Sequence, residues 1–130
     1  MKSKYEHLLR GGTLLFAQNG PIPDLDLRDD LRRIGVDIAG PAGGAADVRR
    51  LLAEPRRIDG AVLDLDLDGR EAVQIADLLI ERGIPFVFAV NDPQLVRREQ
   101  YPGFVLCRKP IHLDEIADAL FGGMSPRGSA

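Results

Sequence analysis

Short runs of apolar residues alternate along this chain with segments whose apolar residues recur at helical spacing. The runs are four to seven residues long and mostly apolar, and Gly, Pro, Asp or Asn bounds them, as in strands buried on both faces of a sheet. They cover residues 13–17, 36–39, 58–63, 84–90 and 104–107. This alternation constrains the fold more than any other feature, because it requires a sheet covered by helices.

The segments between the runs predict amphipathic helices. Apolar residues spaced at i, i+3, i+4 or i+7 occupy four of them, within residues 27–34, 48–52, 72–79 and 113–120. A fifth segment, residues 93–100, carries the weakest helical pattern. Gly35 and Gly83 follow two of the segments, at the place where a helix commonly ends in a left-handed residue.

Strands and helices therefore alternate along the whole chain. Right-handed crossovers turn this order into an α/β fold with a doubly wound, five-stranded parallel sheet and helices on both faces. The length of 130 residues fits one domain. We expect this domain over residues 12–121, with an N-terminal extension over 1–11 and a flexible C-terminal tail over 122–130.

Composition excludes several classes of protein. With 17 basic and 20 acidic residues the net charge is −3, which does not favour a surface that coats nucleic acid, and the dispersed arginine pairs lack interleaved aromatic residues. No apolar run approaches the ~20 residues that span a bilayer, and no signal peptide opens the chain. A single cysteine, Cys107, fits a reducing compartment. We expect a cytoplasmic protein without nucleic-acid or membrane partners.

Polar residues stand where several of the predicted strands end. Gln18 and Asn19 follow the first strand, Asp64 ends the third, and Lys109 follows the fifth. The carboxyl ends of parallel strands form the functional edge of such sheets, so we expect Asp64 and Lys109 to lie close together. An aspartate there is a candidate nucleophile toward phosphorus, and a lysine suits a phosphoryl oxygen or the free carboxylate. Lys109 is the one lysine beyond residue 4.

Three short motifs follow one another at wide separations: Gly40-Pro41-Ala42, Val62-Leu63-Asp64 and Arg108-Lys109-Pro110. Together they resemble the receiver domain of two-component response regulators, over roughly residues 12–121. The segment 85–92 (PFVFAVND) is similar, through Ala89, to the PFxFATGY motif of a group of single-domain receivers found in alphaproteobacteria. The resemblance implies the flavodoxin-like (βα)5 receiver fold and a role in phosphorelay signal transduction.

The same resemblance implies roles for particular residues. In that family an acidic pair after the first strand, an aspartate after the third and a backbone carbonyl two residues later hold Mg²⁺. The aspartate accepts a phosphoryl group from a histidine kinase or a phosphotransfer protein. By position, Asp64 is the phosphoacceptor, the backbone carbonyl of Asp66 is a metal ligand, and Lys109 binds the phosphoryl group. The chain would be a phosphorylated protein and not an enzyme.

Four positions depart from the family pattern. Gln18 and Asn19 replace the acidic pair, Val90 replaces a threonine or serine, and Leu106 replaces the aromatic switch residue. Mg²⁺ prefers anionic oxygen, so we expect the side-chain carbonyl oxygens of Gln18 and Asn19 to be weak metal ligands that leave its binding weak or absent. Asp64 is then the only formal negative charge among the expected ligands. Val90 offers a phosphoryl group no hydrogen bond. Two hypotheses stay open: a slow phosphoacceptor, or a phosphorylation-independent pseudo-receiver that acts as a protein-interaction module.

Other interpretations of these motifs are weaker. Residues 64–69 match the first half of a D-x-D-x-D-G calcium loop, but Ile75 occupies the position that needs a glutamate. They also resemble the start of haloacid-dehalogenase-type phosphatases, but too few residues follow for that fold. Residues 40–44 are glycine-rich without Rossmann spacing or a Walker lysine, which favours a loop leading into a helix over a phosphate cradle.

The predicted domain leaves no room for an effector, so output should pass through a partner. We expect a protein effector to bind the face formed by the fourth helix, fifth strand and fifth helix, around residues 92–99 and 109–118. A homodimer through the same face is a further arrangement that the sequence leaves open.

Overall fold

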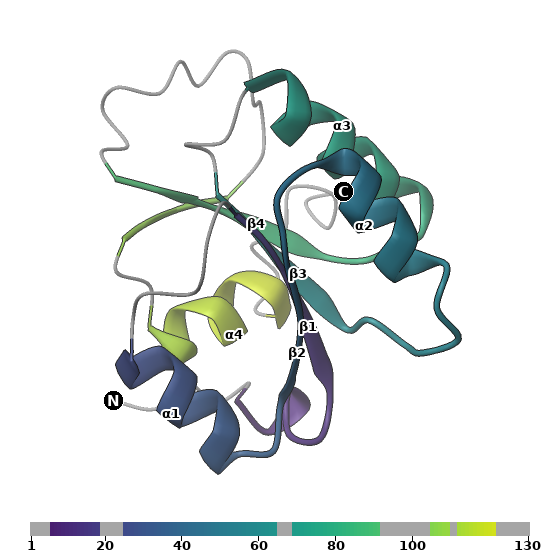
Figure 1. The fold of residues 1–130 in the computed structure, drawn as a ribbon. Helices are drawn as coiled ribbons and strands as arrows, with labels where there is room; N and C mark the ends of the chain where they lie inside the picture. The colour runs from purple at the N-terminus through teal and green to yellow at the C-terminus, as the bar shows by residue number, and fades with distance from the viewer. Residues whose placement is uncertain (1–5, 19–24, 65–68, 92–104, 110–111, 122–130) are drawn as a thin grey trace.

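The computed structural model describes residues 6–18, 25–64, 69–91, 105–109 and 112–121 (Figure 1). A five-stranded sheet in the order β2-β1-β3-β4-β5, with every pair parallel, confirms the predicted doubly wound α/β fold. The elements are η1 Glu6–Leu8, β1 Thr13–Ala17, α1 Leu25–Arg33, β2 Asp37–Ala42, α2 Ala45–Leu52, β3 Gly60–Asp64, α3 Gly69–Glu81, β4 Phe86–Val90, β5 Leu106–Arg108 and α4 Leu113–Phe121.

Helices cover both faces of the sheet, as the apolar runs require. α1 and α4 lie on one face, and α2 and α3 lie on the other (Figure 1). The helix predicted over residues 93–100 lies outside the described residues. In the described part of the chain, no polar or charged side chain is buried, and no helix has the length and apolar composition that a bilayer crossing needs.

The residues before β1 contribute to the core. Leu9 is fully buried in the layer beneath α1 and α4, and η1 contacts α4. The predicted N-terminal extension therefore packs against the domain over its described part. Residues 6–9 are too few to show an apolar periodicity, so the sequence pattern does not predict that they pack against the domain.

The expectation of a loop over residues 40–44 is wrong in part. Gly40 to Ala42 belong to β2, and only Gly43 and Gly44 lie between this strand and α2. The β1–β2 register shifts at this point, and Gly40 has a φ of +106°. A Cβ at this position would lie 2.7 Å from the carbonyl oxygen of Phe16, so only glycine fits. Glycine and proline usually indicate the end of a strand, but here β2 continues through them, past the shift in its register with β1.

Glycines end two helices as predicted. Gly35 has a φ of +76°, and the backbone N–H of Val36 donates to the carbonyl of Leu31 across it (2.8 Å). Gly83, with a φ of +69°, ends α3 in the same arrangement. These left-handed caps satisfy carbonyls that the helix leaves unpaired and turn the chain into the next strand.

Candidate functional site

Asp64 and Lys109 reach the same edge of the sheet from two strands that do not neighbour each other. Asp64 is the last residue of β3, and β4 lies between it and β5. Lys109 directly follows β5, and its backbone N–H donates to the carbonyl of Val90 (2.8 Å). This hydrogen bond extends the β4–β5 pairing by one residue and fixes where the lysine side chain begins.

The two side chains form an ion pair. Lys109 Nζ donates to Asp64 Oδ1 at 2.7 Å, and the exposed fractions of the side chains are 30% for lysine and 17% for aspartate. The closeness expected from strand order is therefore confirmed as a direct contact. Partial burial reduces solvent screening, so this pair is held more firmly than an ion pair on an open surface.

The other predicted ligands divide into described and undescribed residues. Gln18 directly follows β1, and its backbone N–H donates to the carbonyl of Ala42 at the end of β2 (2.8 Å). Its side chain is half-buried. Asn19 and Asp66 lie outside the described residues, so their predicted part in metal binding stays a prediction.

The described donors do not fit a Mg²⁺ ion. No group of three or more His, Cys, Asp or Glu side chains converges among the residues that the structure places. Asp64 contributes one carboxylate, and that carboxylate already contacts an ammonium group at 2.7 Å. Because Mg²⁺ gives up water reluctantly and favours anionic oxygen, this donor set is poor for the ion.

Val90 and Leu106 stand at the positions where the family pattern expects a hydroxyl and an aromatic side chain. Val90 is the last residue of β4 and is 1% exposed. Leu106 begins β5, pairs with Phe88 in the sheet and packs against the core layer beneath α2 and α3. Val90 is therefore part of the apolar core, and Leu106 is partly buried against it.

Cys107 is the middle residue of β5, one residue before the end of the strand, and its side chain is buried in the core. Burial first, and the nearby Glu115 carboxylate second, raise the pKa of its thiol to about 11. The thiol stays protonated at neutral pH and is a poor nucleophile. The prediction that Cys107 is an inert core residue is consistent with this placement.

Glu71 is a residue whose role the sequence did not reveal. It lies in the first turn of α3, and its Oε2 accepts a hydrogen bond from the backbone N–H of Ala45, the first residue of α2 (2.6 Å). A side chain on Gly44 would approach the same oxygen to 3.2 Å. The first turn of α3 is thus tied to the start of α2. An acidic residue in a first turn is common, and no pattern in the sequence names its distant partner.

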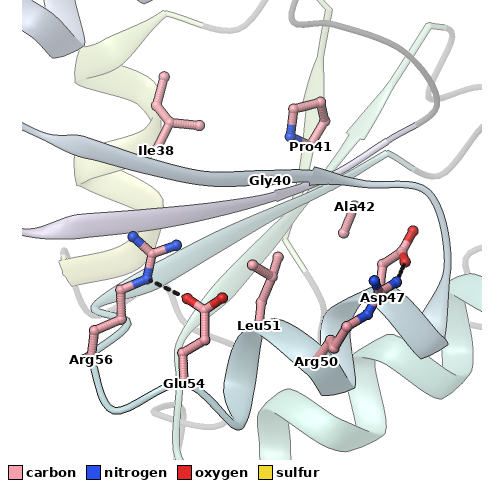
Figure 2. A pocket seen from close by; sticks show the side chains of 9 residues that line it. All are labelled: Ile38, Gly40, Pro41, Ala42, Asp47, Arg50, Leu51, Glu54 and Arg56. Atoms are coloured by element: carbon pink, nitrogen blue, oxygen red, sulfur yellow. Dashed lines mark hydrogen bonds and ion pairs between the residues drawn. The ribbon is translucent and has the colours of Figure 1, made fainter.

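A pocket of about 500 Å³ lies between α2 and the edge strand β2 (Figure 2). Leu51 lies between two ion pairs along it, Arg50 with Asp47 and Arg56 with Glu54. Neither residue of the Asp64–Lys109 pair lines this pocket. Each cation in it already has an acidic neighbour, so the pocket has no unbalanced charge with which to select a ligand.

Comparisons with known proteins agree with this geometry at the level of the fold. No protein-family model and no curated protein sequence matches the chain. Among solved structures, it is similar to the response regulator PhyR from Brucella abortus (TM-score 0.67, 21% identity, 90% of this chain and 51% of PhyR). It is also similar to SdrG from Sphingomonas melonis Fr1 (0.62, 23%, 87% of this chain and 95% of SdrG). A receiver protein from Sinorhizobium medicae WSM419 gives 0.62 and 22%, with 89% of this chain and 96% of that one covered.

Sheet order, layer arrangement and these likenesses define the chain as a receiver domain in fold. The predicted receiver fold is confirmed. The chain spans about half the length of PhyR. The roles of the residues at the sheet edge remain predictions.

Proposed function

We propose that the chain is a receiver module of two-component phosphorelay signalling in which Asp64 accepts a phosphoryl group. One observation carries the proposal: Asp64 Oδ1 and Lys109 Nζ are 2.7 Å apart at the carboxyl ends of β3 and β5. In a parallel sheet this edge is the usual place for a ligand. A carboxylate beside a cation here supports phosphoryl capture better than it supports any reaction that needs a metal-bound water.

The chemistry of the proposed step is simple. A carboxylate oxygen of Asp64 bonds to phosphorus while the bond between phosphorus and its donor breaks, which leaves an acyl phosphate on the protein. Lys109 Nζ then lies within reach of both the carboxyl group and the new phosphoryl oxygens, and its charge offsets the charge that the group brings. The donor is proposed to be a phosphohistidine of a histidine kinase or a phosphotransfer protein. The chain serves as an acceptor and not as an enzyme.

A specific observation favours a second candidate function. Val90 is buried at the end of β4 and carries no hydroxyl, and Gln18 offers an amide where a carboxylate would attract Mg²⁺. These residues support a pseudo-receiver that binds a protein partner without being phosphorylated, with Asp64 and Lys109 as a structural pair. Under either candidate we propose that Mg²⁺ binding is weak or absent.

Intact-mass spectrometry after incubation with acetyl phosphate and Mg²⁺ separates the two candidates. A phosphoacceptor gains the mass of one phosphoryl group, and Asp64→Asn loses that gain. Asp77→Asn, an exposed aspartate on α3, is the matched control and should behave as the parent chain does. Absence of any gain with acetyl phosphate, and also with a kinase, would leave the pseudo-receiver.

Two further variants test the cause of slow transfer. Val90→Thr adds a hydroxyl at the end of β4, and Gln18→Asp adds a carboxylate after the end of β1, with β3 between these two strands. If the site is correctly assigned, Val90→Thr speeds phosphorylation, whereas Gln18→Asp tightens Mg²⁺ binding. SdrG has a BeF3-activated conformation, so beryllofluoride is a suitable second probe for the same site here.

The proposed output is contact with an effector. The expected face includes residues 92–99, which lie outside the described residues, and residues 109–118. Within the second range, Asp118 on α4 is exposed. A homodimer through this face is the alternative arrangement. Membership of the PFxFATGY group is part of the same proposal. So is a cytoplasmic location, since a kinase partner and a reduced cysteine both fit the cytoplasm.

A further inference from the structure

A second pocket, of about 540 Å³, lies at the end of the sheet away from Asp64. The residues that precede β3 and β4 line it, together with η1 and the end of α4. We call it the basal pocket. The residues used in the argument are Leu8, Arg57, Ile58, Arg82, Ile84 and Phe121.

Apolar side chains from both core layers contribute to the floor of the basal pocket. Ile58 and Ile84, 9% and 8% exposed, belong to the layer beneath α2 and α3. Phe121 packs against the layer beneath α1 and α4. The pocket therefore opens where the ends of both layers meet, and an inserted apolar side chain would extend the core instead of covering a surface.

Leu8 adds an apolar side chain that stands in solvent at the edge of this floor. It is 49% exposed, the highest value for a large hydrophobic residue among the described residues. The other two exposed large hydrophobics, Val73 and Ile80, are on α3 and line no part of the pocket. Leu8 therefore adds exposed apolar surface at the edge of the pocket, which an apolar side chain of a partner can contact.

The rim of the pocket carries an excess of positive charge although the whole chain has a net charge of −3. Its charged residues are Arg57, Arg82 and Asp59. Asp59 is engaged within the fold, because Oδ2 accepts the backbone N–H of Thr13 (2.9 Å) and Oδ1 contacts Arg57 Nε (3.0 Å). Arg82 is anchored through one nitrogen, Nη1, on the carbonyl of Leu52 (3.2 Å), which positions the guanidinium at the rim.

We propose that the basal pocket docks an acidic segment of a partner protein, which inserts one large apolar side chain against Leu8 and Phe121 and pairs a carboxylate with Arg57 or Arg82. The apolar side chains of the floor supply a place for an anchor, and two arginines supply directional partners for carboxylates. Arginine is among the residue types that contribute most to binding energy in protein interfaces. The pocket lies away from the Asp64 edge, so a partner here and a phosphoryl donor there need not compete.

A display library of random linear peptides, selected on the full chain, tests the proposal. The expected result is enrichment of peptides in which a large apolar residue lies close to aspartate or glutamate. Leu8→Glu should weaken the binding of a selected peptide about tenfold or more, and Arg82→Gln should weaken it several-fold. Val73→Glu and Arg49→Gln, at exposed positions on α3 and α2, are matched controls that keep the parent affinity.

Amide chemical shifts give a readout of position. A bound peptide should shift the signals of Leu8, Gly83 and Phe121 and leave those of Asp64 and Lys109 in place. Failure to enrich such peptides, or shifts confined to another surface, would overturn the proposal. So would a dimer in sedimentation that Leu8→Glu converts to monomers, because the occupant would then be a second copy of this chain.

Discussion

Asp59 and Thr13 hold each other by two reciprocal hydrogen bonds. The backbone N–H of Asp59 donates to the carbonyl of Thr13, and the N–H of Thr13 donates to Asp59 Oδ2, both at 2.9 Å. Gly12 makes room for the carboxylate, since a Cβ there would lie 2.8 Å from Oδ2. The segment before β3 thereby fixes the start of its neighbour in the sheet, β1.

Replacement of Asp59 should destabilise the fold through this contact. Asp59→Ala leaves the N–H of Thr13 without its acceptor, and we expect a loss of about 1–2 kcal/mol in the free energy of unfolding. Urea denaturation measures it. Asp37→Ala, at an exposed position on the edge strand β2, is the control and should change stability little. Equal losses in the two variants would contradict this role for Asp59.

Glu71 should contribute to the stability of α2 from outside that helix. Glu71→Ala removes the acceptor of the Ala45 N–H, and capping losses of this kind cost about 1 kcal/mol. Hydrogen exchange at Ala45 should rise together with the loss measured by urea. Glu81→Ala, in the last turn of the same helix, tests whether the effect is specific to the first turn.

Gly40 and Gly83 allow two costs of a side chain to be separated. Both have positive φ, but a Cβ at Gly83 meets nothing within 4 Å, whereas one at Gly40 lies 2.7 Å from a backbone oxygen. We expect Gly83→Ala to cost about 1 kcal/mol and Gly40→Ala about 3 kcal/mol. Thermal unfolding of the two variants gives the comparison, and a similar Tm for both would show that β2 can move to relieve the contact.

The Asp64–Lys109 pair should show measurable coupling. A double-mutant cycle with Asp64→Asn and Lys109→Met is expected to give about 1 kcal/mol, decreasing as salt is added, because both side chains are partly exposed. The cycle for Asp47 and Arg50, which are 46% and 77% exposed, should give a coupling near zero. Coupling that does not respond to salt would argue against a charge interaction.

The thiol of Cys107 should make stability depend on pH in the alkaline range. Its pKa rises from 9.0 to about 11 on folding, chiefly through burial. Below pH 9.0 the thiol is protonated in both states and its contribution to stability is complete. As pH rises toward about 11, the unfolded chain releases the proton first, so the free energy of unfolding falls. Cys107→Ala should show a shallower fall, and identical slopes would refute the assignment.

Local periodicity predicts the elements of this fold well and its long-range contacts poorly. The bounds of β1 agree with the apolar run over residues 13–17, and the glycine caps at Gly35 and Gly83 are where helix ends predict them. These features depend only on neighbours in sequence. β2 extends beyond its predicted end at a glycine, Gly40, whose backbone lies close to the carbonyl oxygen of Phe16 on β1. This contact is between strands and leaves no local pattern in the sequence.

The candidate site divides in the same way. The ends of β3 and β5 predict that Asp64 and Lys109 come together, because the topology of a parallel sheet fixes which strand ends share an edge. Glu71 and Leu9 were missed, since each acts through a contact with an element far away in sequence or against a layer that exists only after folding. The order of strands along the chain is enough to predict which side chains meet at the strand ends. Contacts with elements distant in sequence, such as those of Glu71 and Leu9, are found only in the structure.

The shortness of β5 has a consequence for how the edge behaves. This strand comprises only Leu106–Arg108 and pairs with β4 alone in the described sheet. Brief detachment of an outermost strand is among the least costly local openings a domain undergoes. Each such event would carry Lys109 away from Asp64 without disturbing the interior, so any ligand that needs both residues would slow it. Deuterium uptake at Cys107 and Lys109 therefore reports occupancy of the Asp64 edge, even where the ligand itself leaves no spectroscopic trace.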